Sequence, residues 1–217
     1  MALRVHIVAG GPSENLPDLS IYCGEKNVWI GVDRGVIHLI NSGIIPTYAF
    51  GDFDSITETE RLQLQTKINH IDFFPAEKDQ TDSEIGLEFA LQMNEVEEIV
   101  LFGGTGGRLD HLFGNIQLLF KALEKGVFAK LIDKQNEVTL YSPGEYKIEN
   151  SLSYKYISFL PFTEEIQNLT LKGFKYPLMN RHIERGSTLC ISNELIHSVG
   201  TFSFDAGILM MVRSSDV

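Results

Sequence analysis

Four short runs in the first half of the chain combine side chains that could bind a metal ion and a phosphate group. Carboxylate oxygens are the ligands that Mg²⁺ prefers, while backbone amides and an arginine can cover phosphate oxygens. Together the runs predict a site that holds a divalent cation against a polyphosphate. They are Gly51-Asp52-Phe53-Asp54-Ser55, Lys78-Asp79-Gln80-Thr81-Asp82, Gly103-Gly104-Thr105-Gly106-Gly107-Arg108 and Asp110-His111.

The aspartates of the first two runs are the candidate metal ligands. Asp52 and Asp54 lie two residues apart after an apolar run, and in extended backbone such residues share a face. Two carboxylates on one face repel each other unless a cation lies between them, although Gly, Asp and Ser also form ordinary turns. Asp79 and Asp82 flank a threonine, and Asp82 also fits the first turn of a helix, where the dipole favours an anion. The four carboxylates together predict a metal site.

The glycine-rich run over residues 103–107 is the candidate phosphate-binding turn. Several N–H groups of such a turn can converge on one anion, and the helix that follows presents its positive end. Arg108 adds a planar donor for phosphate oxygens. His111 and Asn115 lie one helical turn apart and face the same way. The run is neither a Walker A motif, since no Gly-Lys-Ser/Thr follows, nor a Rossmann fingerprint, which belongs at the first strand–helix turn.

Other polar residues are more ambiguous. Asp33 follows the second predicted strand, either as a site residue or as a helix N-cap. Lys78 either contacts a phosphate or is a solvated loop lysine, and Asp110 either belongs to the site or caps the next helix. The remaining histidines show no ligand spacing, and we expect them to be structural or exposed. They are His6, His38, His70, His182 and His197.

Composition narrows the class of protein. The chain has 217 residues, of which 43% are hydrophobic, enough for one or two domains with a substantial core. The formal net charge of −11 argues against non-specific binding to nucleic acid. Cys23 and Cys190 are too few for a disulfide framework or a zinc site, and we expect reduced thiols in a cytoplasmic protein. We see no signal peptide, and no apolar stretch approaches the roughly 20 residues that span a bilayer.

The four runs lie between predicted strands and helices. An alternation of the two element types predicts a parallel sheet with right-handed crossovers. Ligands bind such sheets at the carboxyl ends of the strands, which is where every run falls. The predicted strands are residues 3–9, 28–32, 47–50, 71–74 and 98–102, and the predicted helices are residues 36–41, 57–67, 81–93 and 109–125.

The pattern changes near residue 134 to short, β-branched or aromatic runs separated by Gly, Pro, Asn or Asp. This predicts a small β-sandwich or jelly-roll-like domain. The predicted fold class is therefore α/β plus all-β, with an N-terminal parallel-sheet domain over residues 1–134 and a C-terminal β domain over residues 135–217. The predicted strands of the second part are residues 138–141, 146–148, 154–160, 168–171, 187–191, 198–204 and 208–212.

These motifs resemble those of the bacterial-type thiamine pyrophosphokinase (thiamine diphosphokinase) family over essentially the whole chain. The resemblance implies transfer of the pyrophosphoryl group of ATP to the hydroxyl of thiamine, giving thiamine diphosphate and AMP, with Mg²⁺ as cofactor. It also implies a homodimer in which thiamine binds between the first domain of one subunit and the second domain of the other. Besides the four runs, the matching pieces are Gly31-Val32-Asp33-Arg34-Gly35, Gly173-Phe174-Lys175-Tyr176-Pro177-Leu178 and Ser192-Asn193-Glu194.

The resemblance also implies roles for individual residues. Mg²⁺ would be held by Asp54, Asp79 and Asp82, with Asp52 either a ligand or a partner of one. Tyr176 would stack on thiamine, and Ser192 and Asn193 would contact its pyrimidine. The predicted catalytic residues are Asp33, Asp52, Asp54, Asp82 and Asp110, with Asp33 or Asp110 orienting or deprotonating the alcohol. The predicted ATP-binding residues are Arg34, Lys78, Gln80, Thr81, Gly104, Thr105, Gly106, Gly107, Arg108, His111 and Asn115.

Two other functions remain open at this point. Clustered aspartates after parallel strands suit a metal-dependent phosphoesterase equally well. Such sites usually add histidine ligands, and no histidine lies beside the acidic pairs in the sequence. A non-catalytic nucleotide-binding regulator is the third reading, and the retained set of acidic residues argues against it.

Overall fold

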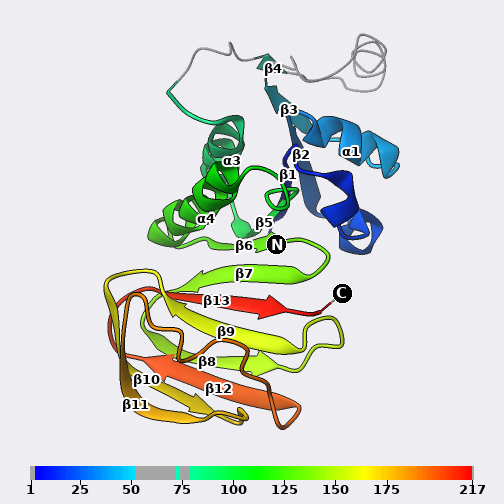
Figure 1. Cartoon of the computed structure of the whole chain (residues 1–217). Helices are drawn as coiled ribbons and strands as arrows, with labels where there is room; N and C mark the ends of the chain where they lie inside the picture. The colour runs from blue at the N-terminus through cyan, green and yellow to red at the C-terminus, as the bar shows by residue number, and fades with distance from the viewer. Residues whose placement is uncertain (1–2, 52–71, 74–78, 217) are drawn as a thin grey trace. The chain divides into compact units, whose positions relative to one another are not determined.

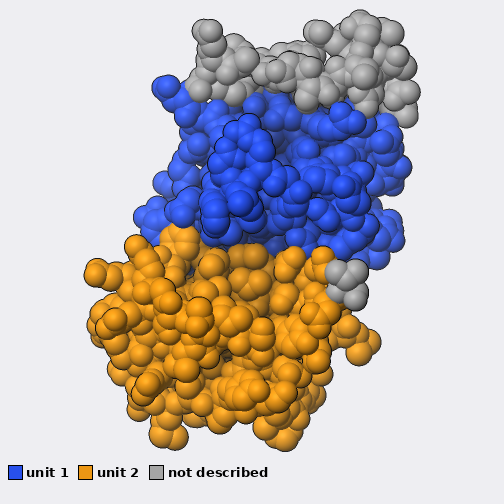
Figure 2. All heavy atoms as spheres, in the orientation of Figure 1, with its two compact units in different colours: residues 1–134 blue, residues 135–217 orange. Residues whose placement is uncertain are grey.

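The computed structural model describes residues 3–51, 72–73 and 79–216, which form two compact units, Met1–Lys134 and Gln135–Val217 (Figure 2). Asp52, Asp54 and Lys78 lie outside the described residues, as does the helix predicted over residues 57–67. Within the described part of the chain, no helix combines the length and apolar character needed to cross a membrane.

A parallel sheet forms the centre of the first unit (Figure 1). Its strands lie in the order β4-β3-β2-β1-β5-β6, and all five neighbouring pairs run parallel, which confirms the predicted sheet type. The order of strands along the chain reverses direction between β1 and β5, so this pair marks the topological switch point. The bounds are β1 Leu3–Val8, β2 Asn27–Val32, β3 Tyr48–Gly51, β4 Asp72–Phe73, β5 Val96–Phe102 and β6 Phe128–Ile132.

Helices cover both faces of this sheet, with α1 on one side and α3 and α4 on the other (Figure 1). Leu39 of α1 packs with Val8, Trp29 and Phe102. The neighbouring strand residues Ile7 and Ile30 point to the other face, where they lie beside Gly86 of α3. Thr81 caps α3, because its side-chain oxygen accepts from the backbone N–H of Glu84 at 3.2 Å. The bounds are α1 Gly35–Asn41, α3 Asp82–Gln92 and α4 Leu109–Glu124, with 3-10 turns at Ser13–Asn15 and Leu19–Tyr22.

The second unit is built from antiparallel strands in two groups, β7-β13-β9 and β11-β10-β12-β8. Both groups contribute apolar side chains to one buried cluster, including Phe159 from the first group and Phe202 from the second. This arrangement is the predicted all-β sandwich. The bounds are β7 Asn136–Tyr141, β8 Gly144–Glu149, β9 Tyr156–Pro161, β10 Glu165–Lys172, β11 Leu178–Glu184, β12 Val199–Phe204 and β13 Leu209–Ser214.

One predicted strand is wrong and two strands were not predicted. Residues 187–191 form irregular structure and a turn rather than a strand. The strand in this region is β11, an outer strand of its group with one fully buried residue, Ile183, so it lacks the apolar alternation that identifies a strand. Strand β6 was missed because its five residues follow directly after the turn that ends α4.

Candidate active site

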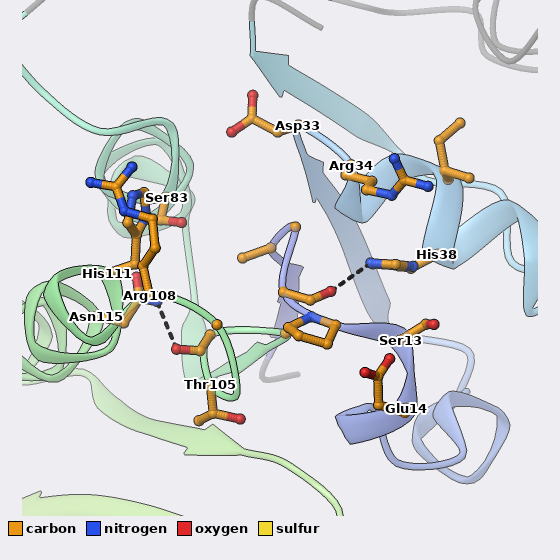
Figure 3. A pocket seen from close by; sticks show the side chains of 18 of the residues that line it. Ser13, Glu14, Asp33, Arg34, His38, Ser83, Thr105, Arg108, His111 and Asn115 are labelled. Carbon is orange, nitrogen blue, oxygen red and sulfur yellow. Dashed lines mark hydrogen bonds between the residues drawn. The ribbon is translucent and has the colours of Figure 1, made fainter. Parts of the chain in front are cut away.

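A cavity of about 680 Å³ opens at the carboxyl ends of β1 and β5 (Figure 3). Its lining comes from the segments that follow β1, β2 and β5, together with α1, α4 and the first turn of α3. The cavity therefore lies at the topological switch point, where parallel α/β sheets bind their ligands. Its volume falls in the range of about 300–1,000 Å³ that is typical of small-molecule sites.

Two glycine turns form the floor of the cavity. The turn after β1 contains Gly11, whose N–H donates to the carbonyl oxygen of Gly103 at 2.9 Å. The turn after β5 begins at Gly103, where φ is +66°, a value that favours glycine. A Cβ atom at Gly11 would lie 2.3 Å from the oxygen of Gly103, so no larger residue fits there. The glycine-rich run is thus explained by close backbone contact as well as by its proposed role with phosphate.

Side chains from two helices reach the floor from opposite sides. Asn115 of α4 donates from Nδ2 to the carbonyl oxygen of Gly104 at 3.1 Å, and His38 of α1 lies with Nε2 2.9 Å from the oxygen of Gly11 (Figure 3). Burial lowers the pKa of His38, so its ring is neutral at pH 7. Since a carbonyl oxygen only accepts, Nε2 carries the proton. The sequence predicts only that His38 is structural or exposed, and a single histidine without ligand spacing gives no sign that it lines the cavity.

A buried carboxylate forms a hydrogen bond with the second glycine turn, the one that follows β5. Thr105 donates its hydroxyl to Oδ2 of Asp133 at 2.7 Å, and Asp133 follows strand β6. Asp133 is 8% exposed, and a buried carboxylate requires hydrogen-bond donors of this kind. This contact also escaped sequence analysis, because it joins residues 28 positions apart and β6 itself was not predicted.

Arg108 and Asp110 form an exposed pair at the start of α4. Nε of Arg108 donates to Oδ1 of Asp110 at 3.1 Å, and the same oxygen accepts from the backbone N–H of His111 at 3.0 Å. The hydrogen bond from Arg108 is the largest cause that lowers the pKa of Asp110 below its ordinary value. Arg108 also lines the cavity, and its guanidinium has five N–H donors. Asp110 can therefore hold the guanidinium of Arg108 in place while the remaining N–H donors of that guanidinium reach an anion.

Asp33 brings a carboxylate to the rim of the cavity at the ends of β2 and β3. Its backbone has φ +50°, and its N–H donates to the oxygen of Phe50 at 2.8 Å. A Cβ atom at Gly51 would lie 2.2 Å from Oδ1 of Asp33, so this carboxylate lies directly against the end of β3. Asp52 and Asp54 follow that point in the sequence.

The structure places part of the predicted site around the cavity. Among the predicted residues, eight line it: Asp33, Arg34, Gly104, Thr105, Gly107, Arg108, His111 and Asn115. Six other described residues of the first unit do not: Asp79, Gln80, Thr81, Asp82, Gly106 and Asp110. Ser83, which follows Asp82 in the first turn of α3, does line it, so the start of this helix reaches the cavity.

The described part of the chain contains no cluster of three or more potential metal ligands. The predicted set comprises two described aspartates, Asp79 and Asp82, and two that lie outside the described residues, Asp52 and Asp54. All four supply carboxylate oxygen, and the set contains no sulfur or imidazole ligand. This donor chemistry fits Mg²⁺ rather than a softer metal.

The predicted thiamine-binding residues lie in the second unit, where Asn193 holds the backbone of Tyr176. Nδ2 of Asn193 donates to the oxygen of Tyr176 at 2.8 Å, while Oδ1 accepts from the N–H of Tyr176 at 3.0 Å and of Glu194 at 2.9 Å. Asn193 is 2% exposed, whereas Tyr176 is 58% exposed. Ser192 is exposed, and its N–H donates to Oγ of Ser158 at 2.9 Å. The structure thus assigns Asn193 a positioning role that was not predicted.

Replacing Asn193 with alanine should lower the free energy of unfolding by about 1–3 kcal/mol, because three backbone hydrogen bonds lose their partner inside the fold. Urea unfolding followed by circular dichroism measures this change. Asn150→Ala is the matched control, since Asn150 is exposed, and we expect a change within about 0.5 kcal/mol. Equal stability of the two variants would contradict the positioning role of Asn193.

Known proteins match both units of the chain. The family model described as "Thiamin pyrophosphokinase, catalytic domain" matches residues 20–131. The model described as "Thiamin pyrophosphokinase, vitamin B1 binding domain" matches residues 145–209. The thiamine pyrophosphokinase of Bacillus subtilis (strain 168) is 55% identical over 212 residues, which cover 98% of this chain and 99% of that protein.

Solved structures agree with these matches. The crystal structure of thiamine pyrophosphokinase from Bacillus subtilis superimposes with a TM-score of 0.94 at 54% identity, covering 99% of this chain and 100% of the other. That of thiamin pyrophosphokinase from Geobacillus thermodenitrificans gives 0.91 at 52% identity, covering 99% and 98%. Sequence identity of this size over nearly complete chains leaves one conclusion: the chain belongs to the thiamine pyrophosphokinase family.

Proposed function

We propose that the chain transfers the pyrophosphoryl group of ATP to the hydroxyl group of thiamine, giving thiamine diphosphate and AMP. The observation that carries this proposal is the cavity at the switch point, with its floor of two glycine turns and its rim of Asp33 and Arg108. Family membership supplies the reaction, and the cavity supplies a place of suitable size and chemistry for the nucleotide.

ATP binds in this cavity with its phosphates over the glycine turns. Backbone amides of such turns and the positive end of α4 favour an anion. Arg34 and Arg108 line the cavity on the sides of α1 and α4 and provide two guanidinium groups for the phosphate oxygens. Local positive charge is required, because the chain carries a formal net charge of −11. Lys78, Gln80, Thr81 and His111 complete the proposed nucleotide contacts.

Mg²⁺ is the proposed cofactor, held by Asp54, Asp79 and Asp82, with Asp52 as a further ligand or a partner of one. The structural support is the carboxylate of Asp33, which lies against Gly51 directly before the first acidic pair, and the start of α3, which reaches the cavity. Bound Mg²⁺ would neutralise charge on the phosphates of ATP as the pyrophosphoryl group is transferred.

Asp33 is the better candidate to orient or deprotonate the thiamine hydroxyl. It lines the cavity, whereas Asp110 does not, and Asp110 is held by Arg108 and by the N–H of His111. The lowered pKa of Asp110 also makes it a weaker base than an ordinary aspartate. Asp33 therefore accepts the hydrogen bond of the alcohol, while Arg108 holds the phosphate chain that the alcohol attacks.

Thiamine is proposed to stack on Tyr176, whose exposed ring can bind a cationic heterocycle. Ser192 contacts the pyrimidine, and Asn193 acts by fixing Tyr176. The active form is proposed to be a homodimer, with thiamine between the first domain of one subunit and the second domain of its partner. Exposed apolar residues of the second unit support such an interface; they include Leu189, Ile191 and Ile196.

Analytical ultracentrifugation tests the dimer directly. The proposal predicts a species of twice the 24.4 kDa of one chain, and a monomer at micromolar concentration contradicts it. We also propose a cytoplasmic location, which fits ATP as a substrate and the two unpaired cysteines, Cys23 and Cys190.

A product assay with thiamine, ATP and Mg²⁺ tests the reaction. We expect one AMP for each thiamine diphosphate, with neither formed when thiamine is omitted. Release of phosphate without thiamine would instead identify a phosphoesterase, and nucleotide binding without turnover would identify a regulator.

A further inference from the structure

The two glycine turns are joined to each other through their backbones. The N–H of Ala9 donates to the oxygen of Phe102 at 2.8 Å, and that of Gly11 donates to the oxygen of Gly103 at 2.9 Å. A Cβ atom at Gly103 would lie 2.4 Å from the oxygen of Ala9, and one at Gly11 would lie 2.9 Å from the oxygen of Thr105. Neither turn can shift far without the other, so they form one continuous surface under the cavity.

Buried side chains form hydrogen bonds with this surface at both of its ends. His38 and Asn115 are each 7% exposed, and each donates one hydrogen bond to a carbonyl oxygen of a different turn. The two residues come from α1 and α4, which cover opposite faces of the sheet (Figure 1). Neither bond is needed to form its own helix, because both reach out of the helix to a turn.

We propose that His38 and Asn115 are paired positioning residues that hold the two glycine turns as a single nucleotide-binding floor. The proposal rests on the proposed function of the cavity as the ATP site. Fixed turns present their N–H groups to the phosphates without first being ordered, and preorganisation of this kind lowers the cost of binding. Because the turns are interlocked, loosening either end should loosen the whole floor.

Loss of the donor at position 38 should raise the dissociation constant of ATP by about 10-fold, as expected for one buried hydrogen bond. His38→Leu removes the donor while filling most of the buried volume, and His38→Gln keeps an N–H donor and should restore most of the affinity. Isothermal titration calorimetry with Mg²⁺ and ATP, without thiamine, gives the dissociation constant. In steady-state assays the KM for ATP should rise, whereas the KM for thiamine should stay within about twofold.

The pairing itself is tested by a double-mutant cycle with Asn115→Leu. We expect each single variant to weaken ATP binding by about 10-fold, and the double variant to be much less than 100-fold weaker, since either change alone releases the floor. Ser42→Ala is the matched control on α1. Its hydroxyl also donates to a backbone carbonyl, that of His38, at 2.9 Å, but Ser42 does not line the cavity.

The outcomes separate this inference from the function on which it rests. If the wild-type enzyme binds ATP and makes AMP while both leucine variants bind it within twofold of wild type, the positioning role is wrong. Fully multiplicative effects would show that the two residues act independently, which overturns the pairing. Thermal unfolding confirms that each variant is folded, and Asn115→Leu tests the floor should His38→Leu not fold. A wild-type protein that binds no ATP would overturn the proposed function and this inference together.

Discussion

The Asp82→Asn variant should remain folded but turn over more slowly than the wild-type enzyme, by a factor on the order of 100 or greater. Asparagine has nearly the same size as aspartate but lacks the negative charge that holds Mg²⁺. Asp82 lies in the first turn of α3, where losing a negative charge costs about 0.3–1 kcal/mol of helix stability. That cost is too small to unfold the protein, so the loss of turnover would reflect the metal site. Asp54→Asn should behave in the same way.

Glu84→Gln is the matched control for Asp82→Asn. Glu84 lies in the same first turn and loses the same charge, but its carboxylate pairs with Lys121 rather than with the proposed cation. We expect its turnover to stay within a few-fold of wild type. Turnover measured across a Mg²⁺ titration, together with the melting temperature, distinguishes the variants. Near-normal rates in both Asp82→Asn and Asp54→Asn would remove the metal assignment.

Replacing Arg108 with alanine should lower kcat/KM for ATP on the order of 100-fold, because Arg108 is the guanidinium proposed to hold the phosphate chain. Arg108→Lys should recover only part of this loss, since an ammonium cannot reproduce the planar donor fork. The side chain is exposed and donates its hydrogen bonds to Asp110, which is exposed as well, so we expect no loss of stability beyond about 0.5 kcal/mol.

Two further variants show how Arg108 acts. Asp110→Asn leaves the guanidinium in place but removes its charged partner, so its effect on kcat/KM should be smaller than that of Arg108→Ala. Arg185→Ala is the control for removing an exposed arginine, because Arg185 lies in the second unit and donates to the oxygen of Phe162 at 3.2 Å. A kcat/KM of Arg108→Ala within twofold of wild type would contradict the assignment.

The sequence predicted the parts of this molecule that local signals determine. Short, mainly apolar runs indicate the buried strands, and Thr81 with its acidic first turn indicates the start of α3. The alternation of strands and helices then placed the chemical runs at one edge of a parallel sheet, which is where the cavity lies.

The parts that escaped prediction depend on contacts between distant segments. His38 is a single histidine in a short helix, and its partner Gly11 lies 27 positions away in the sequence. The family resemblance predicts a ligand contact for Asn193, but no local pattern indicates that its amide is hydrogen-bonded to the backbone of Tyr176, which the fold shows. Strand β11 is exposed at five of its seven positions, since it lies at the edge of its group, and it therefore lacks a regular apolar alternation.

The most direct test of the central claim is a crystal structure of the enzyme with Mn²⁺ in place of Mg²⁺ and the ATP analogue that carries a methylene between the α and β phosphorus atoms. Anomalous scattering locates the metal independently of the refined coordinates. We expect a Mn²⁺ peak within about 2.2 Å of carboxylate oxygens of Asp54 and Asp82, bound to the phosphates that lie over the two glycine turns. Phosphates bound elsewhere, or a metal with no aspartate of this set among its ligands, would contradict it.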